Sequence, residues 1–278
     1  MTNEIPEPYL LTPGPLTTSR ETKQAMLRDW GSRDAAFIRI NREVRERVVG
    51  IAGGGDDLTC VPVQGSGTFA VEAMLATFLP RDGKILLVVN GAYGHRMAKI
   101  CDYMDRAFTV YETPEDTPPD PAAVDALLAA DDDISHVAII HCETTSGILN
   151  PVAAIAEVVA ARGRRLLIDA MSSFGALPLD MGQVPCDAIA ASANKCLEGV
   201  PGMGFVVCRK AVLAATKGNA HSLSLDLHDQ WTAMEASAQW RFTPPTQVIA
   251  AFHQALAEHA AEGGVAGRGA RYRRNCDI

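Results

Sequence analysis

Short, almost uninterrupted apolar runs alternate along this chain with longer segments whose apolar positions recur at helical spacing. The short runs are typical of strands, and the longer segments are typical of helices. Strands without polar alternation, joined by helix-length connections, indicate a mostly parallel sheet with helices on both faces. We therefore predict an α/β fold with strands at residues 58–63, 85–89, 107–111, 137–140, 166–168 and 188–192, and helices at residues 68–78, 93–104, 122–130 and 152–162.

Polar motifs follow the carboxyl ends of several of these predicted strands. The motifs occupy residues 64–68, 90–94, 141–147, 169 and 194–195. Ligands of open parallel sheets bind beyond the carboxyl ends of the strands. The pattern therefore predicts a single binding site that is assembled from segments far apart in the sequence.

Asp169 and Lys195 carry the most specific chemistry of these motifs, because each ends an apolar, strand-like run. A lysine amine in this position can form a Schiff base with the aldehyde of pyridoxal 5′-phosphate (PLP). A carboxylate on a neighbouring strand can pair with the pyridine nitrogen of the same cofactor and keep it protonated. The pair therefore predicts a PLP site.

Both residues could also have simpler roles, which the sequence leaves open. Asp169 could cap a helix that starts at residues 170–173. Lys195 could be a surface lysine, although the apolar approach to it and the Gly- and Pro-containing residues 196–202 favour burial. Burial would lower the pKa of the Lys195 amine and make it a better nucleophile.

A glycine-containing turn at residues 65–68 precedes a predicted apolar helix. The free N–H groups and the dipole of a helix start can hold a phosphate, although an ordinary strand-to-helix turn looks the same. The turn matches neither the Walker nor the dinucleotide fingerprint. Tyr93 follows the next strand in a Gly-flanked loop, where it could stack on a planar cofactor or serve as a core aromatic.

Composition excludes several other classes of protein. The 278 residues carry a net charge of −8, and their basic residues are scattered among acidic ones except for one local cluster at residues 271–274, which argues against binding of nucleic acids. Seven widely spaced cysteines favour reduced thiols, and the start of the chain lacks a signal-peptide pattern, so we expect a cytoplasmic protein. His141 and Glu143 lack a second cluster with matching spacing, so no metal site is predicted.

Several longer strings resemble those of the class V, fold-type I PLP-dependent aminotransferases. The Asn194–Gly199 and His221–Leu227 strings resemble in particular the branch that transfers the amine of 2-aminoethylphosphonate to pyruvate, rather than the alanine–glyoxylate and serine–pyruvate branches. The strings that carry the resemblance are residues 10–18, 28–30, 64–68, 141–151, 168–175, 192–199, 221–227 and 240–246.

The resemblance implies a role for each matching position. Lys195 would carry the cofactor and then act as acid and base, and Asp169 would bind the pyridine nitrogen. The implied cofactor-binding set is Ser66, Gly67, Thr68, Tyr93, Thr144, Asp169, Asn194, Lys195, Thr243 and Thr246. Thr243 and Thr246 fall where a partner subunit contributes phosphate contacts, so the resemblance implies a homodimer.

The resemblance also implies a domain organisation. We expect an N-terminal arm at residues 1–20, a PLP-binding large domain at residues 21–250, and a helix at residues 251–278 that leads toward a C-terminal small domain, itself largely absent. Two other functions stay open at this point. One is an alanine or serine aminotransferase that uses glyoxylate or pyruvate, and the other is a PLP-binding remnant with weak or no catalysis.

Overall fold

The computed structural model describes residues 7–278, which fold around one seven-stranded sheet with the strand order β1-β7-β6-β5-β4-β2-β3. Strands β2 to β6 are mutually parallel, whereas β7 runs antiparallel to both β1 and β6. The predicted α/β fold with a mostly parallel sheet is therefore confirmed. The strands are β1 (Leu58–Gln64), β2 (Lys84–Val89), β3 (Ala107–Glu112), β4 (Ile134–Ile140), β5 (Arg165–Asp169), β6 (Ala188–Ser192) and β7 (Met203–Arg209).

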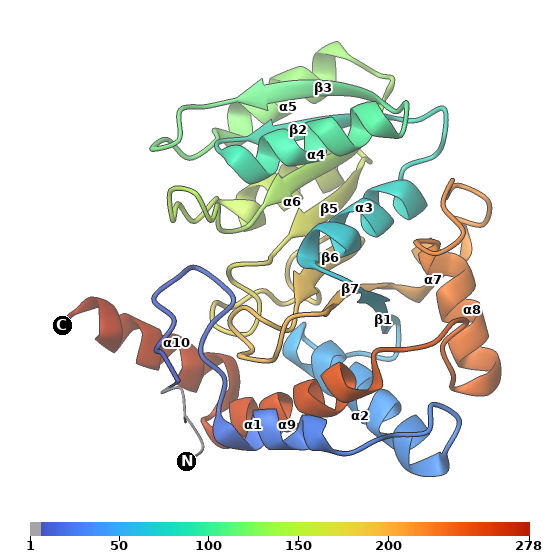
Figure 1. Cartoon of the computed structure of the whole chain (residues 1–278). Helices are drawn as coiled ribbons and strands as arrows, with labels where there is room; N and C mark the ends of the chain where they lie inside the picture. The colour runs from blue at the N-terminus through green and yellow to red at the C-terminus, as the bar shows by residue number, and fades with distance from the viewer. Residues whose placement is uncertain (1–6) are drawn as a thin grey trace.

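Helices cover both faces of this sheet (Figure 1). One face packs against α2, α5, α6 and α9, and the other packs against α3, α4, α7 and α8. The helices are α1 (Arg20–Gln24), α2 (Ala35–Ile51), α3 (Gly67–Phe78), α4 (Ala92–Tyr103), α5 (Pro121–Ala130), α6 (Val152–Ala161), α7 (Lys210–Ala214), α8 (Leu227–Ser237), α9 (Thr246–Ala261) and α10 (Gly264–Cys276), with a short 3₁₀ helix, η1 (Ala25–Leu27), after α1.

The two-sided cover explains why the strands lack polar alternation. In β2, Leu86 and Val88 belong to the core on one face, while Ile85, Leu87 and Val89 belong to the core on the other. Successive side chains of a strand point to opposite faces, so every position of a doubly covered strand must be apolar. The same reasoning holds for β4, whose residues from Val137 to Ile140 are all buried.

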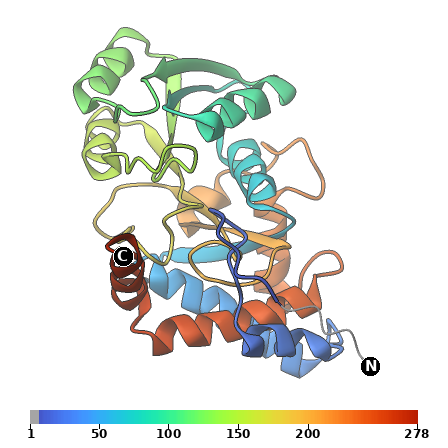
Figure 2. The same ribbon diagram turned by 60° about the vertical axis from the view of Figure 1, so that its left-hand side comes forward.

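The two ends of the described chain meet on one side of the molecule. Helix α9 packs beside α1 and α2, so the red and blue ends of the colour scale lie together in both views (Figures 1 and 2). The predicted boundary at residue 250 falls within α9, and the predicted domain division stays a prediction. Among residues 7–278, the helices are all too short or too polar to cross a membrane.

Candidate active site

The sheet brings Asp169 and Lys195 to the same edge. Asp169 is the last residue of β5, and Lys195 follows the end of the neighbouring parallel strand β6. Both side chains line one cavity of about 390 Å³. The cavity also receives five other residues of the predicted set, namely Ser66, Gly67, Thr68, Tyr93 and Asn194.

Lys195 is half-buried beneath the N-terminal segment of the described chain. Its Nζ donates a hydrogen bond to the Pro13 carbonyl oxygen, at 3.2 Å. A Cβ added to Gly14 would lie 2.4 Å from Lys195 Cδ, and Gly14 has a φ of +147°, so only glycine fits there. Burial lowers the pKa of the Lys195 amine, which favours the neutral, nucleophilic form.

Asp169 is 4% exposed, and its Oδ1 accepts a hydrogen bond from the Met171 N–H at 2.9 Å. Burial raises the pKa of its carboxyl to about 6, with a smaller contribution from the charge of Glu143. Within residues 7–278, this carboxyl forms no ion pair with a basic side chain. Residues 171–173 form a turn rather than a helix, so the helix-cap alternative was wrong, and the carboxyl fits a cationic ring nitrogen.

The start of α3 faces the same cavity. Ser66 occupies the N-cap position, yet its side chain makes no capping hydrogen bond, so the hydroxyl and the first N–H groups of α3 are available to a ligand. A Cβ added to Gly67 would lie 2.5 Å from Met171 Sδ, which explains the small residue in this turn. The free donors and the helix dipole fit a phosphate group.

Arg96 lines the cavity but was not predicted from the sequence. Its guanidinium carbon lies 4.3 Å from the centroid of the Tyr93 ring, and its Nη1 donates to Thr68 Oγ1 at 3.3 Å. Arg96 follows Tyr93 by three residues in α4, so the two share a helix face. That spacing is the signal that could have identified Arg96 from the sequence.

The remaining residues of the predicted set lie outside this cavity. Thr144 lines a neighbouring cavity of about 870 Å³, where its hydroxyl hydrogen-bonds with that of Ser172. Thr243 is exposed beside Gly65 and Phe69, and Thr246 is buried at the start of α9, where its hydroxyl donates to the adjacent Gln247. A single chain therefore does not bring Thr243 and Thr246 to Lys195, and their contribution from a partner subunit stays a prediction.

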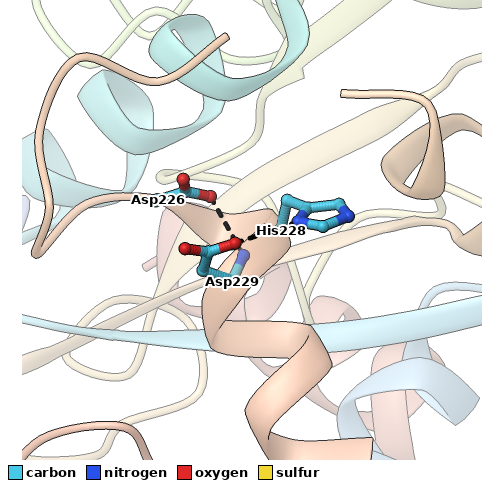
Figure 3. Close-up of side chains that lie close together, drawn as sticks. All are labelled: Asp226, His228 and Asp229. Carbon is cyan, nitrogen blue, oxygen red and sulfur yellow. Dashed lines mark hydrogen bonds and ion pairs between the residues drawn. The ribbon is translucent and has the colours of Figure 1, made fainter. Parts of the chain in front are cut away.

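A separate group of possible metal ligands lies at the start of α8 and consists of Asp226, His228 and Asp229 (Figure 3). Several of its polar atoms already have protein partners. Asp226 Oδ1 accepts from the Asp229 N–H at 3.0 Å, and Asp229 Oδ1 lies 3.2 Å from His228 Nδ1. Asp229 Oδ2 accepts from Arg241 Nη1 at 3.1 Å. These contacts account for the group as a helix cap with its ion pairs.

The fold and the strand-end lysine are those of an aminotransferase, and comparison with protein families agrees. Residues 17–272 match the family described as Aminotransferase class-V, and the chain belongs to this family. It is 59% identical over 272 residues to the 2-aminoethylphosphonate–pyruvate transaminase of a Pseudomonas fluorescens strain, an alignment that covers 98% of this chain and 74% of the relative. The corresponding Pseudomonas aeruginosa transaminase is 57% identical over 270 residues and is covered to 73%.

Solved structures share the fold. An alanine–glyoxylate aminotransferase from Nostoc sp. superposes with a TM-score of 0.91 at 22% identity, covering 100% of this chain and 74% of that one. A pyridoxamine–pyruvate aminotransferase from Mesorhizobium loti superposes with a TM-score of 0.84 at 26% identity, covering 94% of this chain and 67% of that one. The resemblance drawn from the strings of the sequence is therefore confirmed at the level of the family.

Proposed function

We propose that this protein catalyses the PLP-dependent transamination of 2-aminoethylphosphonate with pyruvate, giving phosphonoacetaldehyde and L-alanine. The observation that carries the proposal is the placement of Lys195 and Asp169 at the ends of neighbouring parallel strands, around one cavity. The close relatives named as 2-aminoethylphosphonate–pyruvate transaminases support the choice of substrates. They do not support the alanine or serine alternative.

The residues around the cavity fit PLP. We expect Asp169 to hold the pyridine nitrogen, Tyr93 to stack on the ring, and the turn of Ser66, Gly67 and Thr68 to bind the phosphate. Asn194 would lie beside the phosphate, and Thr144 would lie near the phenolic oxygen. When bound, PLP supplies an aldehyde that reacts with amines and a ring that accepts electrons from the substrate carbon.

The chain's own groups would carry the proton transfers. Burial lowers the pKa of the Lys195 amine and so favours its neutral form, which could accept a proton from the substrate carbon and then donate it to the carbon of the cofactor. The Asp169 carboxylate would keep the adjacent ring nitrogen protonated, because an anion at that position stabilises the cationic form. The Pro13–Gly14 segment, which lies against Lys195, would limit the access of water.

We further propose a homodimer in which Thr243 and Thr246 serve the partner's cofactor. Thr243 is exposed and borders a cavity with Gly65 and Phe69, next to the proposed phosphate turn. A second chain that docked on this surface would place its own Thr243 near that turn. The cytoplasmic location stays a prediction that rests on the sequence.

An absorbance titration tests the proposed function. The purified chain is mixed with PLP, and its spectrum is recorded before and after the addition of 2-aminoethylphosphonate. We expect a visible band from the lysine-linked cofactor that disappears when the donor is added and returns with pyruvate. L-alanine and L-serine serve as comparison donors. Faster conversion by either would contradict the proposed substrate, and a stable band that ignores every donor would indicate a PLP-binding remnant.

A further inference from the structure

Arg96 contacts both the aromatic ring and the helix-start turn to which the proposed function gives separate roles. Its guanidinium lies over the ring of Tyr93 and donates to the hydroxyl of Thr68, in the turn that begins α3. The side chain lines the cavity and is exposed to solvent rather than sealed in the core. It is therefore placed to contact a ligand that spans the distance from the aromatic ring to the helix start.

The other charged side chains that line the cavity indicate what Arg96 could bind. Asp169, Lys195 and Arg96 are the charged side chains that line it, and two of the three are engaged by the proposed chemistry. Burial disfavours the charged form of the Lys195 amine, and the Asp169 carboxylate would be paired with the ring nitrogen of the proposed cofactor. Among residues 7–278, Arg96 is then the permanently charged cation of the lining.

A phosphate group at the start of α3 needs more positive charge than the helix provides. The end of a helix dipole corresponds to roughly half an elementary charge, whereas a phosphate monoester carries close to two negative charges at neutral pH. An arginine offers several N–H donors in a planar fork that matches phosphate oxygens. The Thr68 hydroxyl, which now accepts from Arg96, can turn to the same phosphate.

We propose that Arg96 binds the phosphate of PLP together with the N-terminal turn of α3, and that it makes the site selective for phosphorylated cofactor over pyridoxal. This inference rests on the proposed function, since it takes the cavity to be the PLP site. It adds Arg96 as a cofactor-binding residue that the strand-end pattern of the sequence did not include.

The test compares the dissociation constants of PLP and pyridoxal for the unchanged apoprotein, Arg96→Ala and Arg96→Lys. Both ligands share the aldehyde and the ring, so only the phosphate separates them. We expect Arg96→Ala to weaken PLP binding by about 10- to 100-fold, as for the loss of a charge-assisted hydrogen bond, and to change pyridoxal binding by less than about threefold. Arg96→Lys keeps the charge without the fork and should fall between.

Lys99→Ala provides a matched control, because Lys99 lies on the same helix and its ammonium sits 5.9 Å from the Tyr103 ring, outside the cavity. We expect this variant to bind both ligands as the unchanged protein does. Inorganic phosphate provides a second probe. It should compete with PLP, but not with pyridoxal, for the unchanged apoprotein, and this competition should weaken in Arg96→Ala.

Several outcomes would overturn the inference. Equal weakening of PLP and pyridoxal would mean that Arg96 only supports the Tyr93 ring. An unchanged PLP dissociation constant with a higher half-saturating concentration of 2-aminoethylphosphonate would assign Arg96 to the substrate instead. If the unchanged protein bound PLP without a visible band, the proposed function would fail, whereas a band with no change in selectivity would refute the role of Arg96 alone.

Discussion

Burial acts in opposite directions on the two residues that define the site. It raises the pKa of Asp169 to about 6 and lowers that of Lys195, so each group moves toward its neutral form. Neutral forms are the ones that an apolar cavity tolerates without a counterion. A ligand that brings a positive ring nitrogen and an aldehyde, as the proposed cofactor would, fits both groups.

Lys195→Ala should abolish the visible absorbance of the protein reconstituted with PLP, because the covalent link needs an amine in this cavity. Lys217→Ala changes an exposed lysine outside the cavity and should keep the full band. Spectra recorded after dialysis against PLP measure both. A band that survives in Lys195→Ala would assign the link to another lysine.

Asp169 should also make the stability of the apoprotein depend on pH. Its pKa rises from the usual 3.8 to about 6 on folding, so within this window the folded protein holds a proton that the unfolded chain has released. The folded state is then progressively destabilised as the pH rises from about 4 to about 6, by roughly 3 kcal/mol once the pH exceeds 6.

Asp169→Asn removes this ionisation at almost constant volume. At pH 7 the apoprotein of the variant should be more stable than the unchanged apoprotein by up to about 3 kcal/mol, while its affinity for PLP falls. Urea unfolding between pH 4 and pH 7 measures the difference, with the exposed Asp133→Asn as the control. If the free energy of unfolding changed with pH in Asp169→Asn as it does in the unchanged protein, the Asp169 carboxyl would ionise in the folded state as it does in water.

At the scale of elements, α10 holds the turn that presents Lys195. Arg268 is 2% exposed and donates through Nη1 to the carbonyl oxygen of Cys196, the residue after the lysine, and through Nε to Glu262 at 2.7 Å. Arg271 and Tyr272 both donate to Glu198, whose φ of +54° lies in the left-handed region. The helix thereby compensates a strained turn with several charge-assisted hydrogen bonds.

Arg268→Ala should destabilise the protein by about 1–3 kcal/mol, because it leaves the Cys196 carbonyl oxygen without the Arg268 donor and leaves Glu262 with Arg271 as its remaining arginine partner. Arg274→Ala, on the same helix but exposed, should change the stability by less than about 0.5 kcal/mol. Denaturant midpoints compare the two variants. A loss of stability in Arg268→Ala as small as that in Arg274→Ala would mean that the turn around Lys195 does not depend on its contact with α10.

An element could be predicted from the sequence where its pattern of apolar residues is typical of one kind of secondary structure. Buried parallel strands such as β2 were located to within a residue, because an unbroken apolar run of this length is typical of a strand covered on both faces. Strand β7 was missed although its residues are equally apolar, and its antiparallel direction has no signature in such a run. Helix α2 was missed as well, despite the helical spacing of Phe37, Ile40, Val44 and Val48.

The site divides in the same way. Asp169, Asn194 and Lys195 were predicted to lie together because the sequence can mark the end of a parallel strand, and they line one cavity. Arg96 was missed because it lies one turn inside a helix, where an arginine is usually a solvated side chain. Thr243 and Thr246 came only from the family resemblance, since no rule of sheet topology connects them to Lys195.

At the scale of the whole molecule, the surface around Thr243 carries exposed aromatic side chains. Phe69 is 49% exposed and Phe242 is 50% exposed, and both border the cavity that Thr243 lines. Large apolar groups that gather on one surface beside a proposed binding site are typical of an interface. These exposed aromatic side chains support the proposed dimer independently of the comparison with relatives.

Phe242→Asp should shift the protein from dimer to monomer and weaken PLP binding at the same protein concentration, because it places a charge in the proposed interface. Tyr103→Asp alters a side chain that is 83% exposed on α4 and should leave the dimer intact. Light scattering over a concentration series gives the molar mass of each variant. A monomeric unchanged protein, or a dimer that tolerates Phe242→Asp, would contradict this arrangement.

The hydrogen bond between Lys195 and Pro13 joins residues 182 positions apart, and α10 holds the same turn from the other end of the chain. A ribosome releases these segments in order, from Pro13 to the lysine and finally to Tyr272. The Lys195 amine therefore acquires these contacts only after Tyr272 has emerged, since contacts distant in sequence must wait for their second partner. A nascent chain that met the aldehyde of PLP earlier would offer it no better amine than any other lysine, so we expect capture of the proposed cofactor to follow the emergence of α10.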